Sequence, residues 1–415
     1  MLRDTLIYSR RDFIKTLAVA GLSASLPSFL TDSVLAQQAA GISPDFKDDR
    51  ILVVIQLGGG NDGLNAVIPH ADDNYYRLRG NIAVDKKDML TIDDTTALNA
   101  NLAALKGLYD NGSLAILHGV GYPNPNRSHF RSMEILHTAT DADRYSTTGW
   151  IGRFFDNCCG GAPNPLAGVN IGREMPQSFA SARGLGVSFD EPKNFGWAGQ
   201  GRATRAAFDA VNHSADAHHD DTPIDFLRHV TANAMASSDK VLRASKVNRA
   251  GADYPQSRLA GSLKSIATLI AGGLPTRIYY ASMSGFDTHA NQVNTHGNLL
   301  KQFAEATAAF QKDLKSIGVA DRVQILCFSE FGRRVESNAS RGTDHGTAGP
   351  MFLLGAGVKP GLHGTLCSLT DLDDGDLKHT MDFRSVYAEI LGKWLGADPK
   401  VVLGQEWPMP GVITG

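Results

Sequence analysis

The hydrophobic pattern of the chain is a series of short, continuous apolar runs separated by longer amphipathic stretches. The first run is followed at once by three glycines, Gly58 to Gly60, and the run 323–328 ends in Ser329 and Glu330. Runs of this length and composition are typical of strands buried on both faces of a sheet. We interpret as strands the residues 51–57, 113–118, 277–281, 323–328 and 351–354.

Between these runs, hydrophobic residues recur with the period of an amphipathic helix. The helical stretches are residues 102–109, 130–136, 223–246, 256–271, 299–317 and 382–395. Strands that alternate with helices predict an α/β fold, with a mostly parallel central sheet and helices on both faces. We expect one domain over residues 37–415, with an insertion or lid at about 158–222, where glycine, proline, asparagine and serine are abundant.

Polar residues with chemical potential follow the apolar runs or stand at the start of the next helix. In parallel sheets, ligands gather outside the carboxyl ends of the strands. We therefore expect these side chains to converge along one edge of the sheet. They are Asp62, Ser128, Asp287, His289, Glu330 and His345.

Carboxylates and imidazoles in one pocket are the ligand set of Zn²⁺, Mn²⁺ or a similar divalent metal. Such a metal polarises a phosphoryl or sulfuryl oxygen and lowers the pKa of a water or serine hydroxyl. A hydrolase that uses Ser128 with a histidine and an aspartate, without metal, is a weaker alternative. The sequence around Ser128 lacks the Gly-x-Ser-x-Gly elbow of such enzymes.

Several of these residues also have ordinary structural interpretations. Ser128 precedes a helical stretch, where a serine commonly caps the helix and where the helix dipole also stabilises anions. His296 is on the apolar side of the helix 299–317 as it is extended backwards, so it is either a core histidine or a metal ligand. The histidines and aspartates within residues 213–221 admit a metal site, although we favour a solvated loop.

The N-terminus predicts export. Arg10 and Arg11 precede an apolar stretch rich in small residues, which is followed by Val34-Leu35-Ala36. This order is typical of a twin-arginine signal peptide over residues 1–36, and it predicts a periplasmic or otherwise exported protein with no membrane span in the mature chain. A basic amphipathic helix is the alternative. The chain has 40 basic and 43 acidic residues, a net charge of −3, which argues against nucleic acid as a partner.

Six motifs are spread over the mature chain, at residues 58–65, 126–130, 149–153, 285–289, 328–333 and 343–346. Together these motifs resemble the DUF1501 family of exported bacterial proteins, whose fold is similar to that of the alkaline phosphatase and sulfatase superfamily. The resemblance implies an alkaline-phosphatase-like fold. It also implies a ligand order that Asp62, Ser128, Asp287 with a histidine, Glu330 and His345 follow. Phe331 departs from it, because a phenylalanine replaces the histidine expected there and cannot bind a metal.

We therefore hypothesise an exported, metal-dependent hydrolase acting on a small anionic ester or a cell-envelope substrate. In this hypothesis Asp287 and His345 hold one divalent metal, Zn²⁺ or similar, together with either His289 or His296. Asp62 and Glu330 would orient that metal or bind a second one. Ser128 would be the nucleophile and Arg333 would pair with the anionic ester. Because of Phe331, a catalytically inactive binding or assembly protein on the same fold is the alternative.

Overall fold

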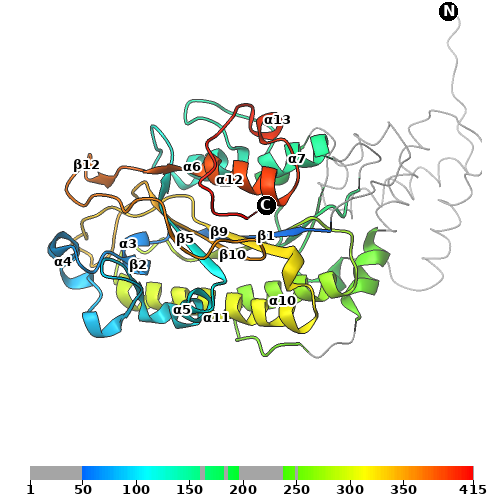
Figure 1. Ribbon diagram of the computed structural model, residues 1–415, viewed down its shortest axis with the longest axis horizontal. Helices are drawn as coiled ribbons and strands as arrows, with labels where there is room; N and C mark the ends of the chain where they lie inside the picture. The colour runs from blue at the N-terminus through cyan, green and yellow to red at the C-terminus, as the bar shows by residue number, and fades with distance from the viewer. Residues whose placement is uncertain (1–48, 159–163, 182–185, 196–236, 248–250, 415) are drawn as a thin grey trace, which may run out of the picture.

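The computed structural model describes residues 49–158, 164–181, 186–195, 237–247 and 251–414, and a nine-stranded sheet forms its centre (Figure 1). The order of the strands is β11 (Gly361–His363), β5 (Leu114–Gly121), β10 (Gly349–Gly355), β9 (Val323–Phe328), β1 (Ile51–Gly58), β8 (Ile278–Ser284), β6 (Gly168–Ile171) and β7 (Val187–Phe189), and β14 (Met381–Asp382) pairs with β5. Strand β10 is antiparallel to β5 and β9, and the other pairings are parallel. The predicted, mostly parallel sheet is confirmed.

Helices cover both faces of this sheet, as predicted (Figure 1). One layer consists of α5 (Ala103–Asp110), α10 (Arg258–Ala271) and α11 (Gln292–Ser316), and the other contains α6 (His129–Thr138), α7 (Trp150–Cys158), α12 (Phe383–Glu389) and α13 (Pro399–Leu403). Strand β1 shows why both layers are needed. Val53 packs into the core under the first layer and Val54 into the core under the second, and both are at most 1% exposed. Burial of each such side chain stabilises the folded state by about 1.5–3 kcal/mol relative to its exposure to water.

The direction of β10 decides where His345 lies. In register with β9, Phe352 pairs with Cys327 and Leu354 with Ile325, so β10 begins at the edge where β9 ends. A residue that precedes β10 therefore meets the residues that follow β9. The remaining predicted elements agree to within a few residues, except that α11 begins seven residues earlier than expected and includes His296.

Part of the segment expected to be an insertion belongs to the central sheet instead. Strands β6 and β7 lie within it, and β6 pairs with β8. The two strands have only 4 and 3 residues, which is too short for a recognisable apolar run. The predicted signal peptide and the histidines of residues 213–221 lie outside the described residues. Residues 223–236 of the predicted helix 223–246 also lie outside them, and the described part of that helix is helical.

Smaller elements complete the described fold. They are α3 (Gly63–Ala66), β2 (Val67–Ile68), α4 (Asp73–Arg79), β3 (Met89–Thr91), β4 (Ala97–Asn99), the hairpin of β12 (Leu372–Asp373) and β13 (Asp376–Leu377), and a π-helical turn, Ile390–Trp394, after α12. Among the described helices, none has both the length and the hydrophobicity to cross a membrane.

Candidate metal centre

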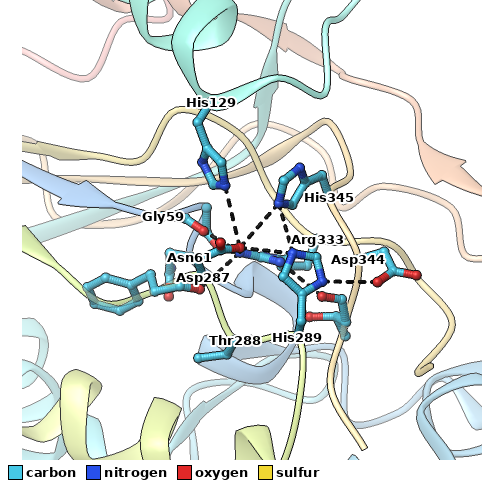
Figure 2. A network of polar contacts seen from close by, with 12 residues as sticks. Gly59, Asn61, His129, Asp287, Thr288, His289, Arg333, Asp344 and His345 are labelled. Atoms are coloured by element: carbon cyan, nitrogen blue, oxygen red, sulfur yellow. Dashed lines mark hydrogen bonds and ion pairs between the residues drawn. The ribbon is translucent and has the colours of Figure 1, made fainter. Parts of the chain in front are cut away.

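Three histidines converge on one carboxylate at the edge of the sheet (Figure 2). The Nε2 atoms of His289, His345 and His129 lie 3.0, 3.2 and 3.4 Å from Oδ1 of Asp287. Nε2 of His289 is also 3.0 Å from Nε2 of His345. The side chains are between a quarter and a half exposed, so the cluster is open to solvent on one side.

The strands deliver these residues to one place. His129 is the first residue of α6 and follows β5, while Asp287 and His289 lie in the loop between β8 and α11. His345 forms an isolated antiparallel bridge with Arg333, between β9 and β10. The glycine turn after β1 makes room for the loop of Asp287. Gly59 has a φ of +120°, and a Cβ on it would lie 2.4 Å from the Asp287 nitrogen, so only glycine fits.

Each histidine is held by its other ring nitrogen. Nδ1 of His129 is 2.9 Å from Oε1 of Glu330, and Nδ1 of His289 is 3.0 Å from Oδ1 of Asp344. Nδ1 of His345 is 2.8 Å from the backbone oxygen of Arg127. Carboxylate and carbonyl oxygens only accept hydrogen bonds, so these partners assign the proton to Nδ1 in all three rings. A ring that carries its one proton on Nδ1 presents an Nε2 lone pair to Asp287.

This arrangement calls for a cation. Three lone pairs and a carboxylate oxygen that face one another repel unless a proton or a metal ion lies among them. Nε2 of His129 is buried and has no hydrogen-bond partner among the described residues. One ligand atom from each of His129, Asp287 and His345 can be chosen so that all lie within 4.8 Å of one another. Histidines fixed through Nδ1 by carboxylates or carbonyls are typical of metal sites, so the residues present fit a divalent ion.

Asp287 is ionised. Burial acts to raise its pKa, but the hydrogen bond from Arg333 and the nearby imidazole of His345 outweigh burial and lower the pKa to about 2. The pKa of Asp344 is also lowered, chiefly by its hydrogen bond from Asn338 and also by His289. Each ring nitrogen of His289 therefore faces a charged carboxylate, Nε2 that of Asp287 and Nδ1 that of Asp344.

Arg333 supports the cluster from behind and is not open to an anionic ester. The side chain is fully buried, and its NH2 group donates to Oδ1 of Asp287 at 2.7 Å. Nε donates to the Gly60 oxygen at 2.7 Å, and NH1 to the Thr343 oxygen at 2.9 Å. The predicted contact between Arg333 and substrate therefore does not fit the structure, because the protein's own oxygens use these donors.

Asp62 lies apart from the cluster in a buried ion pair. Its two oxygens accept from Arg79 at 2.6 and 2.9 Å, and Gln292 donates to Oδ2 at 2.5 Å. Burial acts to raise the pKa of Asp62, but Arg79 outweighs burial and the pKa is lowered. The structure thus does not bring Asp62 to the metal centre as predicted, because a guanidinium already occupies its carboxylate.

His296 and Glu330 also have other partners. His296 is buried, its Nε2 lies 2.9 Å from Oδ1 of Asn61, and burial lowers its pKa to about 4. Of the two histidines left open by the sequence, His289 is the one in the cluster. Glu330 is buried and accepts from the Gly59 nitrogen at 2.7 Å as well as holding His129. It therefore orients a candidate ligand and does not face the metal position itself.

Ser128 stands next to the cluster, at the N-cap of α6. It is exposed, and its side chain makes no capping bond. Its hydroxyl has no hydrogen-bond partner among the described residues, while its backbone nitrogen donates to Oδ1 of Asn126 at 2.8 Å. The ordinary capping interpretation of this serine therefore does not account for its hydroxyl, which stays free beside His129.

His129 is the residue that sequence reasoning missed. It stands in the motif 126–130, where attention fell on its neighbour Ser128 as the start of the helix. A histidine in the first turn of a helix that follows a buried strand was the available signal. Phe331 packs against it: the ring centroids of Phe331 lie 4.9 Å from those of His129 and of His345. Phe331 thus forms a wall of the centre.

The fold is similar to several solved structures at low sequence identity. The lipoteichoic acid synthase LtaP from Listeria monocytogenes shares 11% identity at a TM-score of 0.36, over 82% of this chain and 74% of that chain. The C-terminal periplasmic domain of EcEptC from Escherichia coli, in complex with Zn, shares 11% at 0.38, over 88% and 89%. A protein in the alkaline phosphatase superfamily from Vibrio parahaemolyticus shares 9% at 0.33, over 81% and 70%.

No curated protein matches the sequence. A family model described as a protein of unknown function, DUF1501, matches residues 118–403, which is more than half of the 415 residues. The matched range includes His129, Asp287, His289 and His345. The family predicted from the motifs is confirmed: this chain belongs to the DUF1501 family.

Proposed function

We propose that this protein is a metal-dependent hydrolase that acts on a phosphate or sulfate ester. The observation that supports the proposal is the convergence of three Nε2 atoms on the Asp287 carboxylate, with every Nδ1 held by an oxygen. His129, His289, His345 and Asp287 would hold the ion. Nitrogen and carboxylate ligands suit Zn²⁺, although Mn²⁺ or a similar ion is compatible with them.

A bound divalent ion supplies Lewis acidity to the ester oxygens and favours the ionised form of a nearby hydroxyl. Ser128 would be the nucleophile, because its hydroxyl makes no capping bond and lies at the N-terminus of α6, where the helix dipole stabilises negative charge. In the overall reaction the bond between phosphorus or sulfur and the ester oxygen breaks. The alcohol leaves with the proton of Ser128 while Oγ of Ser128 forms a bond to phosphorus or sulfur. Water then breaks that bond, returns a proton to the serine and gives its hydroxyl group to the released anion.

Arg333 acts on the reaction through Asp287. Its buried guanidinium fixes Oδ1 and lowers the pKa of Asp287, so the carboxylate keeps the negative charge that would attract a cation. Asp344 likewise fixes the ring of His289, through Nδ1. These positioning contacts keep the ligand atoms together before the ion arrives.

A binding or assembly role that retains the metal is the alternative proposal. Phe331 favours it, because its ring packs on two of the imidazoles and stands where the family resemblance implies a metal-binding histidine. The pairing of Asp62 with Arg79 also removes a carboxylate from a second ion site. Both observations support a single ion per chain.

Metal analysis of the purified protein tests the proposal first. We expect about one tightly held divalent ion per chain. His345→Ala and His129→Ala should lose it, whereas the control His363→Ala should keep it, because His363 contacts the Lys359 oxygen and not the cluster. The proposal is contradicted if the protein binds no ion, or if both cluster variants hold as much metal as the wild type.

Turnover then separates the enzyme from the binding protein. The metal-loaded protein is assayed with p-nitrophenyl phosphate and p-nitrophenyl sulfate, before and after Ser128→Ala. Loss of activity in that variant at unchanged metal content supports Ser128 as nucleophile, and full activity contradicts that role. Metal binding without turnover of either ester favours the alternative function.

We also propose export through the twin-arginine signal of residues 1–36, followed by action in the periplasm on a cell-envelope substrate. The pair Arg10 and Arg11 before the apolar stretch supports this. Replacing both arginines by lysine should leave the precursor inside the cell when fractions are compared by immunoblot. Processing of that variant at the wild-type rate contradicts the proposal.

A further inference from the structure

A cavity of about 310 Å³ lies next to the metal centre and has no part in the chemistry proposed above. Its walls come from the loop between β5 and α6, from the segment between β9 and β10, and from the β12–β13 hairpin with the residues after it. Each of these segments also supplies or supports a residue of the metal centre. The cavity is therefore built into the same edge of the sheet.

The floor of the cavity is apolar. Tyr122, Phe331, Ala348 and Leu377 line it, and each is at most 6% exposed over the whole residue. Phe331 has a second contact, since its ring also packs on His129 and His345. One aromatic ring thus separates the cavity from the metal ligands.

The rim of the cavity carries hydrogen-bonding groups that the protein leaves unused. The side chains of Asn124, Asp373 and His379 line the cavity and have no partner among the described residues. Asn124 and Asp373 are exposed, and His379 is partly buried. Asn124 also has a φ of +53°, a backbone conformation that is uncommon for residues other than glycine. An amide, a carboxylate and an imidazole provide both donors and acceptors.

A chain of contacts ties this cavity to the geometry of the metal ligands. Asp376 lines the cavity and accepts from Nε of Arg127 at 2.7 Å. The backbone oxygen of Arg127 in turn faces Nδ1 of His345 at 2.8 Å. Asp376 is 1% exposed, and its Oδ1 has no hydrogen-bond partner among the described residues. Arg334 faces Oδ1 at 3.6 Å, beyond hydrogen-bond distance.

The charge of the cavity excludes an anion and leaves a neutral ligand. Asp373 and Asp376 line the cavity. Among the described lining residues there is one lysine, Lys378, and its charge is paired because it donates to Asp371. Arg127 at its border is matched by two carboxylates, Asp374 and Asp376. An apolar floor under a rim of free donors and acceptors suits a ring with one hydrophobic face and several hydroxyls.

We propose that this cavity binds a sugar ring, and that the ester cleaved at the metal centre is therefore an ester of a carbohydrate. The second part of this statement depends on the function proposed above, and the first does not. The ring lies over Phe331 and Tyr122, and its hydroxyls bind Asn124, Asp373 and His379. The volume of about 310 Å³ accommodates one ring and not a longer oligosaccharide.

Binding is measured without turnover, by saturation-transfer NMR and titration of the metal-loaded, purified protein. The probes are D-glucose, D-galactose, D-mannose and N-acetyl-D-glucosamine at millimolar concentration, with inorganic phosphate as the anionic comparison. Asp373→Ala and Asn124→Gly remove rim groups, and glycine also accepts the positive φ at position 124. Asp321→Ala is the control, an exposed aspartate in the 3₁₀ turn before β9 that does not line the cavity.

We expect at least one sugar to bind, and each rim variant to weaken it by about tenfold through loss of one hydrogen bond to a charged or polar group. The control should bind as the wild type does, and metal content should stay constant throughout. No binding of any of the four sugars, or binding by both rim variants as tight as that of the wild type, overturns the proposal. Sugar binding without ester turnover refutes the proposed hydrolase and retains the cavity, whereas turnover of p-nitrophenyl phosphate without sugar binding does the reverse.

Discussion

The ion pair of Asp62 with Arg79 offers a sharp test of the structural account, because the sequence suggested a metal ligand and the structure shows a buried partner. The variant Asp62→Asn keeps the size of the side chain and removes its charge. Both side chains are 0% exposed, and the guanidinium donates to both carboxylate oxygens at 2.6 and 2.9 Å. The variant therefore leaves a buried guanidinium without its counter-charge.

The expected loss of stability follows from that geometry. Removing one partner of a buried ion pair costs about 3–5 kcal/mol, because the other charge stays in the protein interior. Arg79 is poorly placed to compensate, since its Nε has no hydrogen-bond partner among the described residues. The double variant Asp62→Asn with Arg79→Met removes both charges, and we expect it to recover part of the loss.

The assay is urea unfolding followed by tryptophan fluorescence, with the metal content of each variant measured in parallel. Asp110→Asn is the matched control, because its pair with Lys106 is 2.6 Å long but half exposed, and such pairs contribute about 1 kcal/mol or less. If Asp62→Asn unfolds at the same urea concentration as the wild type and loses its ion, Asp62 is a ligand and the structural account is wrong.

Three further predictions concern Glu330, Gly59 and His296. Glu330→Gln removes the charge that holds the ring of His129, and it should weaken metal binding about 10–100-fold in chelator competition. The control Glu336→Gln, on the surface, should not weaken it. Equal metal affinities of the two variants contradict the orienting role of Glu330. Gly59→Ala should lose the metal, because a Cβ meets backbone at 2.4 Å, while Gly273→Ala tests its positive φ alone in open space; a metal content equal to wild type would show that the loop yields. Burial lowers the pKa of His296 from 6.5 to about 4. The unfolded chain therefore binds more protons between these pH values, and the free energy of unfolding falls as pH falls from about 6.5 to about 4. His296→Gln should reduce that slope by up to about 1.4 kcal/mol per pH unit, and an unchanged slope in urea unfolding would show that this ring does not titrate as described.

The sequence by itself determined the layered fold and the edge at which chemistry gathers. Continuous apolar runs such as Ile51 to Leu57 have no polar face, so they fit only a sheet covered on both sides. Parallel strands end at one edge, which is why Asp287, His289 and His345 could be placed together from sequence. The short strands β6 and β7 escaped, because 4 and 3 residues carry no clear period.

Only the tertiary structure decided which polar side chains meet. Asp62 finds Arg79 at a distance of 17 residues and Gln292 at 230 residues, and nothing local in the sequence indicates either pairing. His129 reaches the centre because α6 begins beside the loop after β8. Arg333 turns inward because five oxygens from three separate segments, residues 59–60, 286–287 and 343, accept its donors. Residue type and spacing specify which groups are near an edge. The partner that each group takes depends on contacts between segments far apart in the chain, which form only when the sheet is complete.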